Sequence, residues 1–139
     1  EVSDIRRRVR TAIDAARLRA SERRARATEA KREYETFLEQ RAIPAFHQFA
    51  AALVGEGFLY KVFTPAGTVR LAAERSPDEF LELGLDDTAD PPQVVLRTSR
   101  GRGRRIIEDV KELTGPAQSL TDEDVIAILL KEIVPFLER

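Results

Sequence analysis

The residues with the clearest chemical potential are the arginines of the stretch RTSRGRGRR, which runs from residue 97 to residue 105. A guanidinium group is planar and donates paired hydrogen bonds to phosphate or carboxylate oxygens, so a cluster of arginines is typical of anion binding. The candidate anion-binding residues are Arg97, Arg100, Arg102, Arg104 and Arg105.

The same stretch also fits the tip of a β-hairpin. An apolar run ending at Leu96 precedes it, and Ile106 and Ile107 follow it, as two paired strands would. In a hairpin, Gly101 and Gly103 would serve the backbone geometry of the turn. The sequence therefore favours a hairpin tip, and it leaves open whether the arginines there meet an anion or only water.

His47 is the only histidine of the chain, which removes any site with several histidine ligands. It lies between Phe46 and Phe49 on a predicted amphipathic helix, and no G-x-S-x-G motif is present elsewhere. A catalytic histidine needs a nucleophile and an orienting partner. We therefore interpret His47 as a structural or surface residue.

The acidic loop containing Asp86, Asp87 and Asp90 offers oxygen atoms of the kind that divalent cations bind. However, it lacks the spacing of an EF-hand loop, and an aspartate before two prolines is typical of a turn. The chain has no cysteine, phosphate-binding loop or dinucleotide-binding motif. These observations predict a protein that is not an enzyme and has no catalytic, metal-binding or cofactor-binding residues.

The composition predicts one folded domain with a charged appendage. The chain has 139 residues, of which 42% are hydrophobic and 34% are charged. It has no apolar run of membrane-spanning length and no signal-peptide pattern, which predicts a soluble cytoplasmic protein without membrane contact. Residues 1–33 carry eleven basic and six acidic side chains, a net charge of +5, whereas the rest carries twelve and eighteen, a net charge of −6.

The elements that would position these residues begin with a long helix. The sequence from Ser3 or Asp4, either of which could cap the helix, to Arg41 contains no glycine or proline and is rich in Ala, Arg and Glu. Its first turns carry an apolar stripe that consists of Ile5, Val9, Ala12, Ile13 and Ala16. Arginines such as Arg23 fall in the seam of any heptad frame through this stripe, so we expect an alanine-lined, loosely paired or solvent-bridging helix rather than a regular coiled coil.

The rest of the chain predicts an α+β domain over residues 43–139, preceded by an extended helical arm over residues 1–42. Pro44 is expected to kink or break the long helix, or to begin a second one. The segments FLYKVF, TVRLAAE, FLELGL, QVVLRTS and RRIIEDVKEL predict an antiparallel β-meander of four to five strands, with a short helix as the alternative for the last segment.

The C-terminal segment SLTDEDVIAILLKEIVPFLER predicts a helix capped by Ser119 or Thr121. Because it is apolar on more than one face, we expect it to pack on the sheet and also against another helix, from the same chain or from a second copy.

Two functions are compatible with this pattern. The first is a non-enzymatic protein-protein interaction or oligomerisation module, either a homo-oligomer with a dimer favoured or a complex with a partner protein bound through the arm. Its candidate interaction residues are Ile5, Val9, Ile13, Val125, Ile128 and Leu129. The alternative is a nucleic-acid-associated protein that uses the arginine-rich arm and the hairpin of residues 97–105 as one basic surface.

Overall fold

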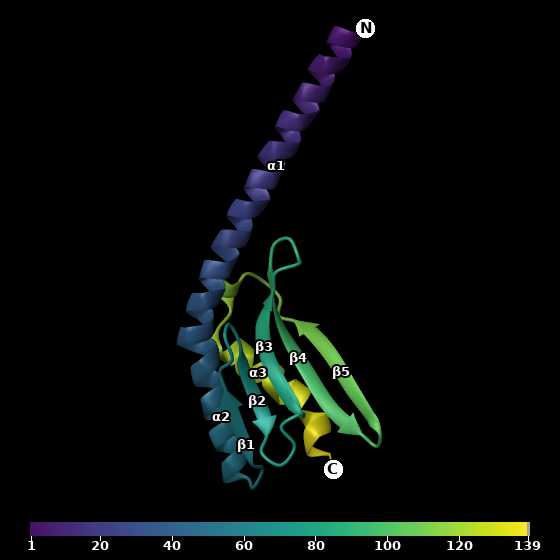
Figure 1. Cartoon of the computed structure of the whole chain (residues 1–139). Helices are drawn as coiled ribbons and strands as arrows, with labels where there is room; N and C mark the ends of the chain where they lie inside the picture. The colour runs from purple at the N-terminus through teal and green to yellow at the C-terminus, as the bar shows by residue number, and fades with distance from the viewer. Residues whose placement is uncertain (139) are drawn as a thin grey trace.

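In the computed structural model, which describes residues 1–138, two helices pack on one face of a five-stranded sheet and a long helix projects far beyond them (Figure 1). This is the predicted α+β fold with a long N-terminal helix, an antiparallel meander and a C-terminal helix on the sheet. The helical elements are α1 (Val2–Phe37), the π-helical turn η1 (Leu38–Ala42), α2 (Ile43–Gly55), the 3-10 turn η2 (Ala117–Ser119) and α3 (Asp122–Leu137).

The long helix begins earlier than its predicted caps, and Pro44 lies in the first turn of α2, which was one of the alternatives predicted for it. Its N-cap is Glu1, without a side-chain cap, so the expected capping by Ser3 or Asp4 is wrong. Before Pro44 the helix widens into η1, where the backbone N–H of Ile43 donates to the carbonyl oxygen of Leu38. Proline lacks a backbone N–H and crowds the preceding turn of an α-helix, and the π-helical turn accommodates this because its hydrogen bonds span one more residue. The helix therefore continues from α1 into α2.

The sheet is a meander in which every strand pairs with its neighbour in sequence, and all pairs are antiparallel. The strands are β1 (Tyr60–Phe63), β2 (Val69–Ala73), β3 (Phe80–Asp86), β4 (Gln93–Arg102) and β5 (Arg105–Glu112). The segment for which a short helix was the alternative is thus a strand. The β4–β5 turn consists of Gly103 and Arg104, slightly later than the GRG turn expected from the sequence. Gly103 has a φ of 63°, a conformation that glycine adopts without steric cost.

The core lies between the sheet and the helices α2 and α3. Leu71, Leu81, Leu83 and Leu96 lie on the same face of the sheet and are fully buried on the helical side. Helix α3 begins with a capping box, in which Thr121 Oγ1 accepts from the N–H of Asp124 and the Asp124 carboxylate accepts from the N–H of Thr121. This confirms Thr121 as the cap.

The lower part of α1 belongs to this core. Tyr34, Phe37, Leu38 and Ala42 are all buried, so the helix is part of the folded body well before residue 42. Along the described part of α1, Arg26 is the first residue whose side chain forms an ion pair with the body, and its partner is Asp90. We use the name free arm for residues 2–25, which is shorter than the arm of residues 1–42 expected from the sequence.

Across residues 1–138, no helix has the length and apolar character needed to cross a membrane.

Candidate interaction surfaces

The free arm carries an exposed apolar stripe. Ile5, Val9 and Ile13 are 54%, 51% and 44% exposed. Their spacing of four residues places them on one face of the helix, and Val2 lies on the same face. Leu18 is also exposed but lies on the opposite face. The arm therefore presents a defined apolar side rather than scattered apolar residues.

The same face of α1 continues into the body. Ala16, Ala20, Ala27 and Ala30 follow the stripe at intervals of three, four or seven residues and lead to Tyr34, which is buried. One side of the helix is thus mainly apolar over its length, with Arg23 and Lys31 as interruptions. The body covers only the end that contains Tyr34.

Two polar contacts fix the base of the arm. The Tyr34 hydroxyl donates to the carbonyl oxygen of Gly67 at 2.5 Å, and Arg26 Nη2 lies 3.3 Å from Asp90 Oδ2. Burial, together with the negative charge of Glu82, raises the pKa of Tyr34. A cleft of about 410 Å³ lies between α1 and the loop before β4. It is lined mainly by apolar atoms, including those of Ala30, and its lining residues place the helix beside the sheet.

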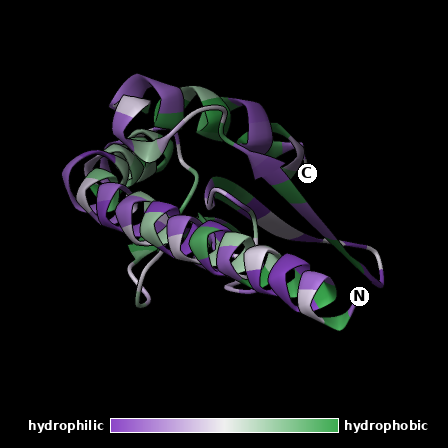
Figure 2. Ribbon diagram, turned by 90° about the horizontal axis from the view of Figure 1, so that it is seen from above, coloured by the Kyte–Doolittle hydropathy of each residue, from purple (hydrophilic) through white to green (hydrophobic). Residues whose placement is uncertain are grey.

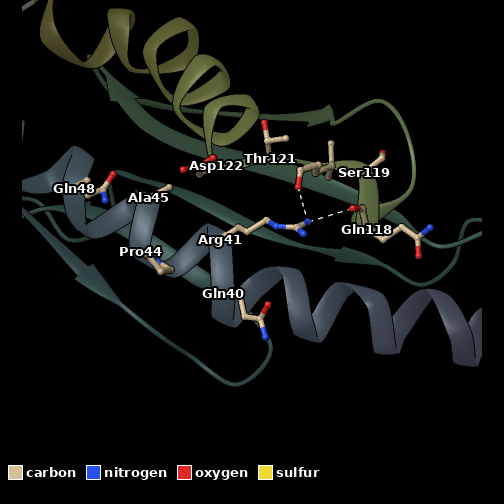
Figure 3. A pocket seen from close by; sticks show the side chains of 10 residues that line it. Gln40, Arg41, Pro44, Ala45, Gln48, Gln118, Ser119, Thr121 and Asp122 are labelled. Carbon is tan, nitrogen blue, oxygen red and sulfur yellow. Dashed lines mark hydrogen bonds between the residues drawn. The ribbon is translucent and has the colours of Figure 1, made fainter.

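A second cleft, of about 300 Å³, surrounds Arg41 at the junction of η1, η2 and the start of α3 (Figure 3). Arg41 Nη1 donates to the carbonyl oxygens of Gln118, at 3.2 Å, and Leu120, at 2.8 Å. These carbonyl groups lie in the connection that leads into α3. Arg41 therefore links the long helix to the C-terminal helix, and its guanidinium is engaged in structural contacts.

The arginines predicted to bind an anion do not form one cluster. Arg97 lies on the face of the sheet opposite the helices, where Nη2 contacts Glu82 Oε1 at 2.6 Å. The alternation of the strand places Arg100 and Arg102 on the other face. Arg104 belongs to the turn. The structure thus divides the group between two faces and the tip of the hairpin.

The tip itself has mixed charge. Arg100, Arg104 and Arg105 line a shallow hollow together with the carboxylates of Asp78 and Glu79. Glu79 Oε2 accepts a hydrogen bond from the backbone N–H of Gly101 at 2.9 Å. Carboxylates at this position reduce the attraction of the arginines for an anion.

The free arm and the hairpin tip lie at opposite ends of the molecule (Figure 1). The single basic surface required by the nucleic-acid interpretation is therefore absent from one copy of residues 1–138.

The residues considered for catalysis or metal binding are in ordinary surroundings. His47 is exposed on α2. The Asp86 carboxylate accepts hydrogen bonds from the N–H of Thr88, at 3.0 Å, and from its hydroxyl, at 2.6 Å, and these bonds lower the pKa of Asp86. The acidic loop is thus stabilised as a turn, and within the described part of the chain no group of three or more Asp, Glu, His or Cys side chains is arranged to hold a metal.

The interaction residues predicted on α3 occupy a different place from those on the arm. Val125 and Leu129 are fully buried in the core, and Ile128 is partly buried. Val125 and Leu129 are therefore not available to a partner of this folded chain. The apolar residues that α3 exposes are Leu130 and Val134, which the sequence interpretation missed. Both faces of this helix are apolar, so sequence periodicity alone did not indicate which of them faces the sheet.

A second missed feature is a charged cluster on the open face of the sheet. Glu82 is buried and accepts from Arg70 Nε at 2.7 Å in addition to Arg97. The guanidinium of Arg70 also lies over the ring of Phe80, 3.8 Å from its centroid. This cluster joins β2, β3 and β4 through hydrogen-bonded charged groups on the open face.

Comparison with protein-family models, with curated proteins and with solved structures finds no match for this chain.

Proposed function

We propose that this chain is a non-enzymatic module that associates with protein through its free arm, with a second copy of the same chain as the favoured partner and a dimer as the favoured assembly. The observation that carries the proposal is the exposed stripe of Ile5, Val9 and Ile13 on a helix that projects from the body (Figure 1). Coloured by hydropathy, the ribbon of this helix alternates between hydrophobic and hydrophilic segments (Figure 2). An apolar stripe on a helix normally faces a packing partner.

The free arm has little else to stabilise it. Most of the stability of a helix in a protein comes from the packing of an apolar face rather than from helix propensity. Within residues 2–25 of the described chain, the only ion pair is that of Asp4 with Arg8, at 3.9 Å and exposed. Complete burial of the three stripe residues would contribute about 3 kcal/mol, taking about 1 kcal/mol for the exposed part of each side chain. A partner on this face would therefore stabilise the arm substantially.

The experiment compares Ile13→Glu with the matched control Leu18→Glu, which makes the same kind of change on the opposite face of the arm. Mass in solution is measured by light scattering at tens of micromolar. We expect the unaltered protein and Leu18→Glu to be associated and Ile13→Glu to be shifted towards the monomer. An unaltered protein that is a clean monomer under these conditions contradicts self-association.

The second candidate is nucleic-acid binding by the arm alone. It is favoured by the composition of residues 2–25, which contain eight arginines and three acidic residues, a net charge of +5. Binding of random duplex and single strands is measured over a range of salt concentrations. An absence of binding at low salt, or an affinity that salt does not change, removes this candidate.

A further inference from the structure

Helix α3 exposes an apolar stripe along the flank of the helix, beside the row of residues that it buries in the core. Leu130 and Val134 are 56% and 47% exposed, and the partly buried Ile126 and Leu137 extend the stripe at each end. Together they occupy one face of the helix over three turns. Apolar rows of this kind on a small domain mark contact surfaces.

From this surface and the free arm we infer that the arm docks antiparallel on this exposed flank of α3 of a second copy. The inference rests on the proposed function, and it specifies the surface that receives the arm.

The spacing of the two stripes matches when the helices run in opposite directions. Along the arm, the intervals from Val2 through Ile5 and Val9 to Ile13 are three, four and four residues. Along α3, read from its C-terminal end, the intervals between its four stripe residues are also three, four and four. Antiparallel packing thus aligns the arm residues in turn with Leu137, Val134, Leu130 and Ile126, over about 16 Å in each helix.

The charges of the two helices are complementary. The free arm has a net charge of +5, whereas α3 contains four acidic residues and one lysine, a net charge of −3. In the antiparallel alignment, Arg17 lies four residues beyond the end of the arm stripe and faces the first turn of α3, which contains Asp122, Glu123 and Asp124. A parallel alignment would place that acidic turn beyond the start of the arm, so charge favours the antiparallel direction.

The contact is intermolecular because the arm points away from its own body (Figure 1). The helix runs without interruption from α1 through η1 into α2, which prevents it from folding back onto α3 of the same copy. If the arm of each copy docks on α3 of the other copy, the two equivalent contacts form a closed symmetric dimer.

Two other self-associations are less favourable. Pairing of two free arms would bring together two helices that each carry +5 and would place Arg23 in their seam. Pairing of two β5 edges would bring together copies of Glu108 and Asp109, which occupy the middle of that strand. Such charges on an exposed edge disfavour pairing with another strand.

The test compares Leu130→Glu on α3 and Ile13→Glu on the arm with the control Ile106→Glu on β5. All three residues are exposed, so each variant is expected to fold, and circular dichroism with thermal unfolding checks this. Dissociation constants of the dimer are measured by sedimentation. We expect at least a tenfold weakening for Leu130→Glu and for Ile13→Glu, and no more than a twofold change for Ile106→Glu.

Mixing the two weakened variants makes the test specific. Leu130→Glu retains a normal arm and Ile13→Glu retains a normal α3, so the mixture can form one of the two contacts. We expect a mixed dimer at concentrations at which each variant alone is monomeric. If Leu130→Glu remains as associated as the unaltered protein while Ile13→Glu dissociates, docking on α3 is overturned and the proposed role of the arm stands.

A further outcome affects the proposed function itself. If the unaltered protein is monomeric, or if Ile13→Glu leaves association unchanged, the arm is not the interaction element and both proposals fail. Should Leu130→Glu fail to fold, Leu130→Ala in the same mixing experiment replaces it, with the same expected order of affinities.

Discussion

Glu82 and Arg97 face each other across strands β3 and β4, and their side chains form a hydrogen-bonded ion pair with an Oε1–Nη2 distance of 2.6 Å. The carboxylate is almost completely buried, whereas the guanidinium reaches solvent. Burial on its own raises the pKa of Glu82, but the hydrogen bonds and charges of Arg97 and Arg70 outweigh it and lower the pKa below its usual value. The folded state therefore favours the ionised form of Glu82.

We expect Glu82→Gln to reduce the free energy of unfolding at pH 7 by about 1–2 kcal/mol, because the guanidinium groups lose a charged acceptor. The folded-state pKa of Glu82 is lower than the unfolded one. Its contribution is therefore present above an unfolded value of about 4.3 and is lost as the pH falls through the folded value. Measured by urea unfolding, the free energy of unfolding should decrease less between pH 7 and pH 3 for Glu82→Gln than for the unaltered protein. Glu112 is exposed, so Glu112→Gln is the control. If the free energy of unfolding of Glu82→Gln changes with pH in parallel with that of the unaltered protein, the prediction is contradicted.

Tyr34→Phe should lower the free energy of unfolding by about 1 kcal/mol at pH 7, because it removes the hydrogen bond to the carbonyl oxygen of Gly67. The pKa of Tyr34 is raised in the folded state, so the unfolded state releases its proton first as the pH rises above about 10. The unaltered protein should then lose stability with increasing pH, and its advantage over Tyr34→Phe should shrink. Urea unfolding from pH 8 to pH 11 measures this difference in the free energy of unfolding. A constant difference over that range would contradict a raised pKa of Tyr34 in the folded state.

Gly103→Ala should destabilise the protein by about 1 kcal/mol, because the φ of 63° at this position places an added Cβ too close to the backbone. Gly101→Ala is the matched control two residues away. Its added Cβ would have Glu79 Oε2 as its nearest neighbour, at an ordinary contact distance of 3.7 Å, so we expect a change within about 0.5 kcal/mol. Thermal unfolding of both variants checks whether Gly103→Ala loses more stability than Gly101→Ala. An equal loss for the two glycines would show that the turn is not the cause.

Local sequence signals predicted the elements well. The meander follows from strands of alternating polarity separated by Gly and Pro turns, and the start of α3 follows from the cap at Thr121 and the acidic turn after it. These signals depend on neighbouring residues, so they can be read without knowledge of the fold.

The surfaces were harder to predict because they depend on contacts between distant segments. The pairing of Arg97 with Glu82 results from the register of β3 against β4, which the arginine cluster itself does not reveal. Likewise, the burial of Val125 and Leu129 and the exposure of Leu130 depend on the rotation of α3 about its axis. A helix that is apolar on two sides has no unique inward face in its sequence.

The π-helical turn η1 has a mechanical consequence. Because the chain passes Pro44 without leaving helical geometry, the free arm and α2 form one continuous rod whose lower end is embedded in the core. The free arm is therefore a rigid spacer about 36 Å long, at 1.5 Å per residue, rather than a tether. A flexible linker would lose orientational freedom when its tip is bound, whereas this rod has already lost it during folding. Any protein that binds the tip of the arm would consequently be held at a fixed distance and direction from the sheet.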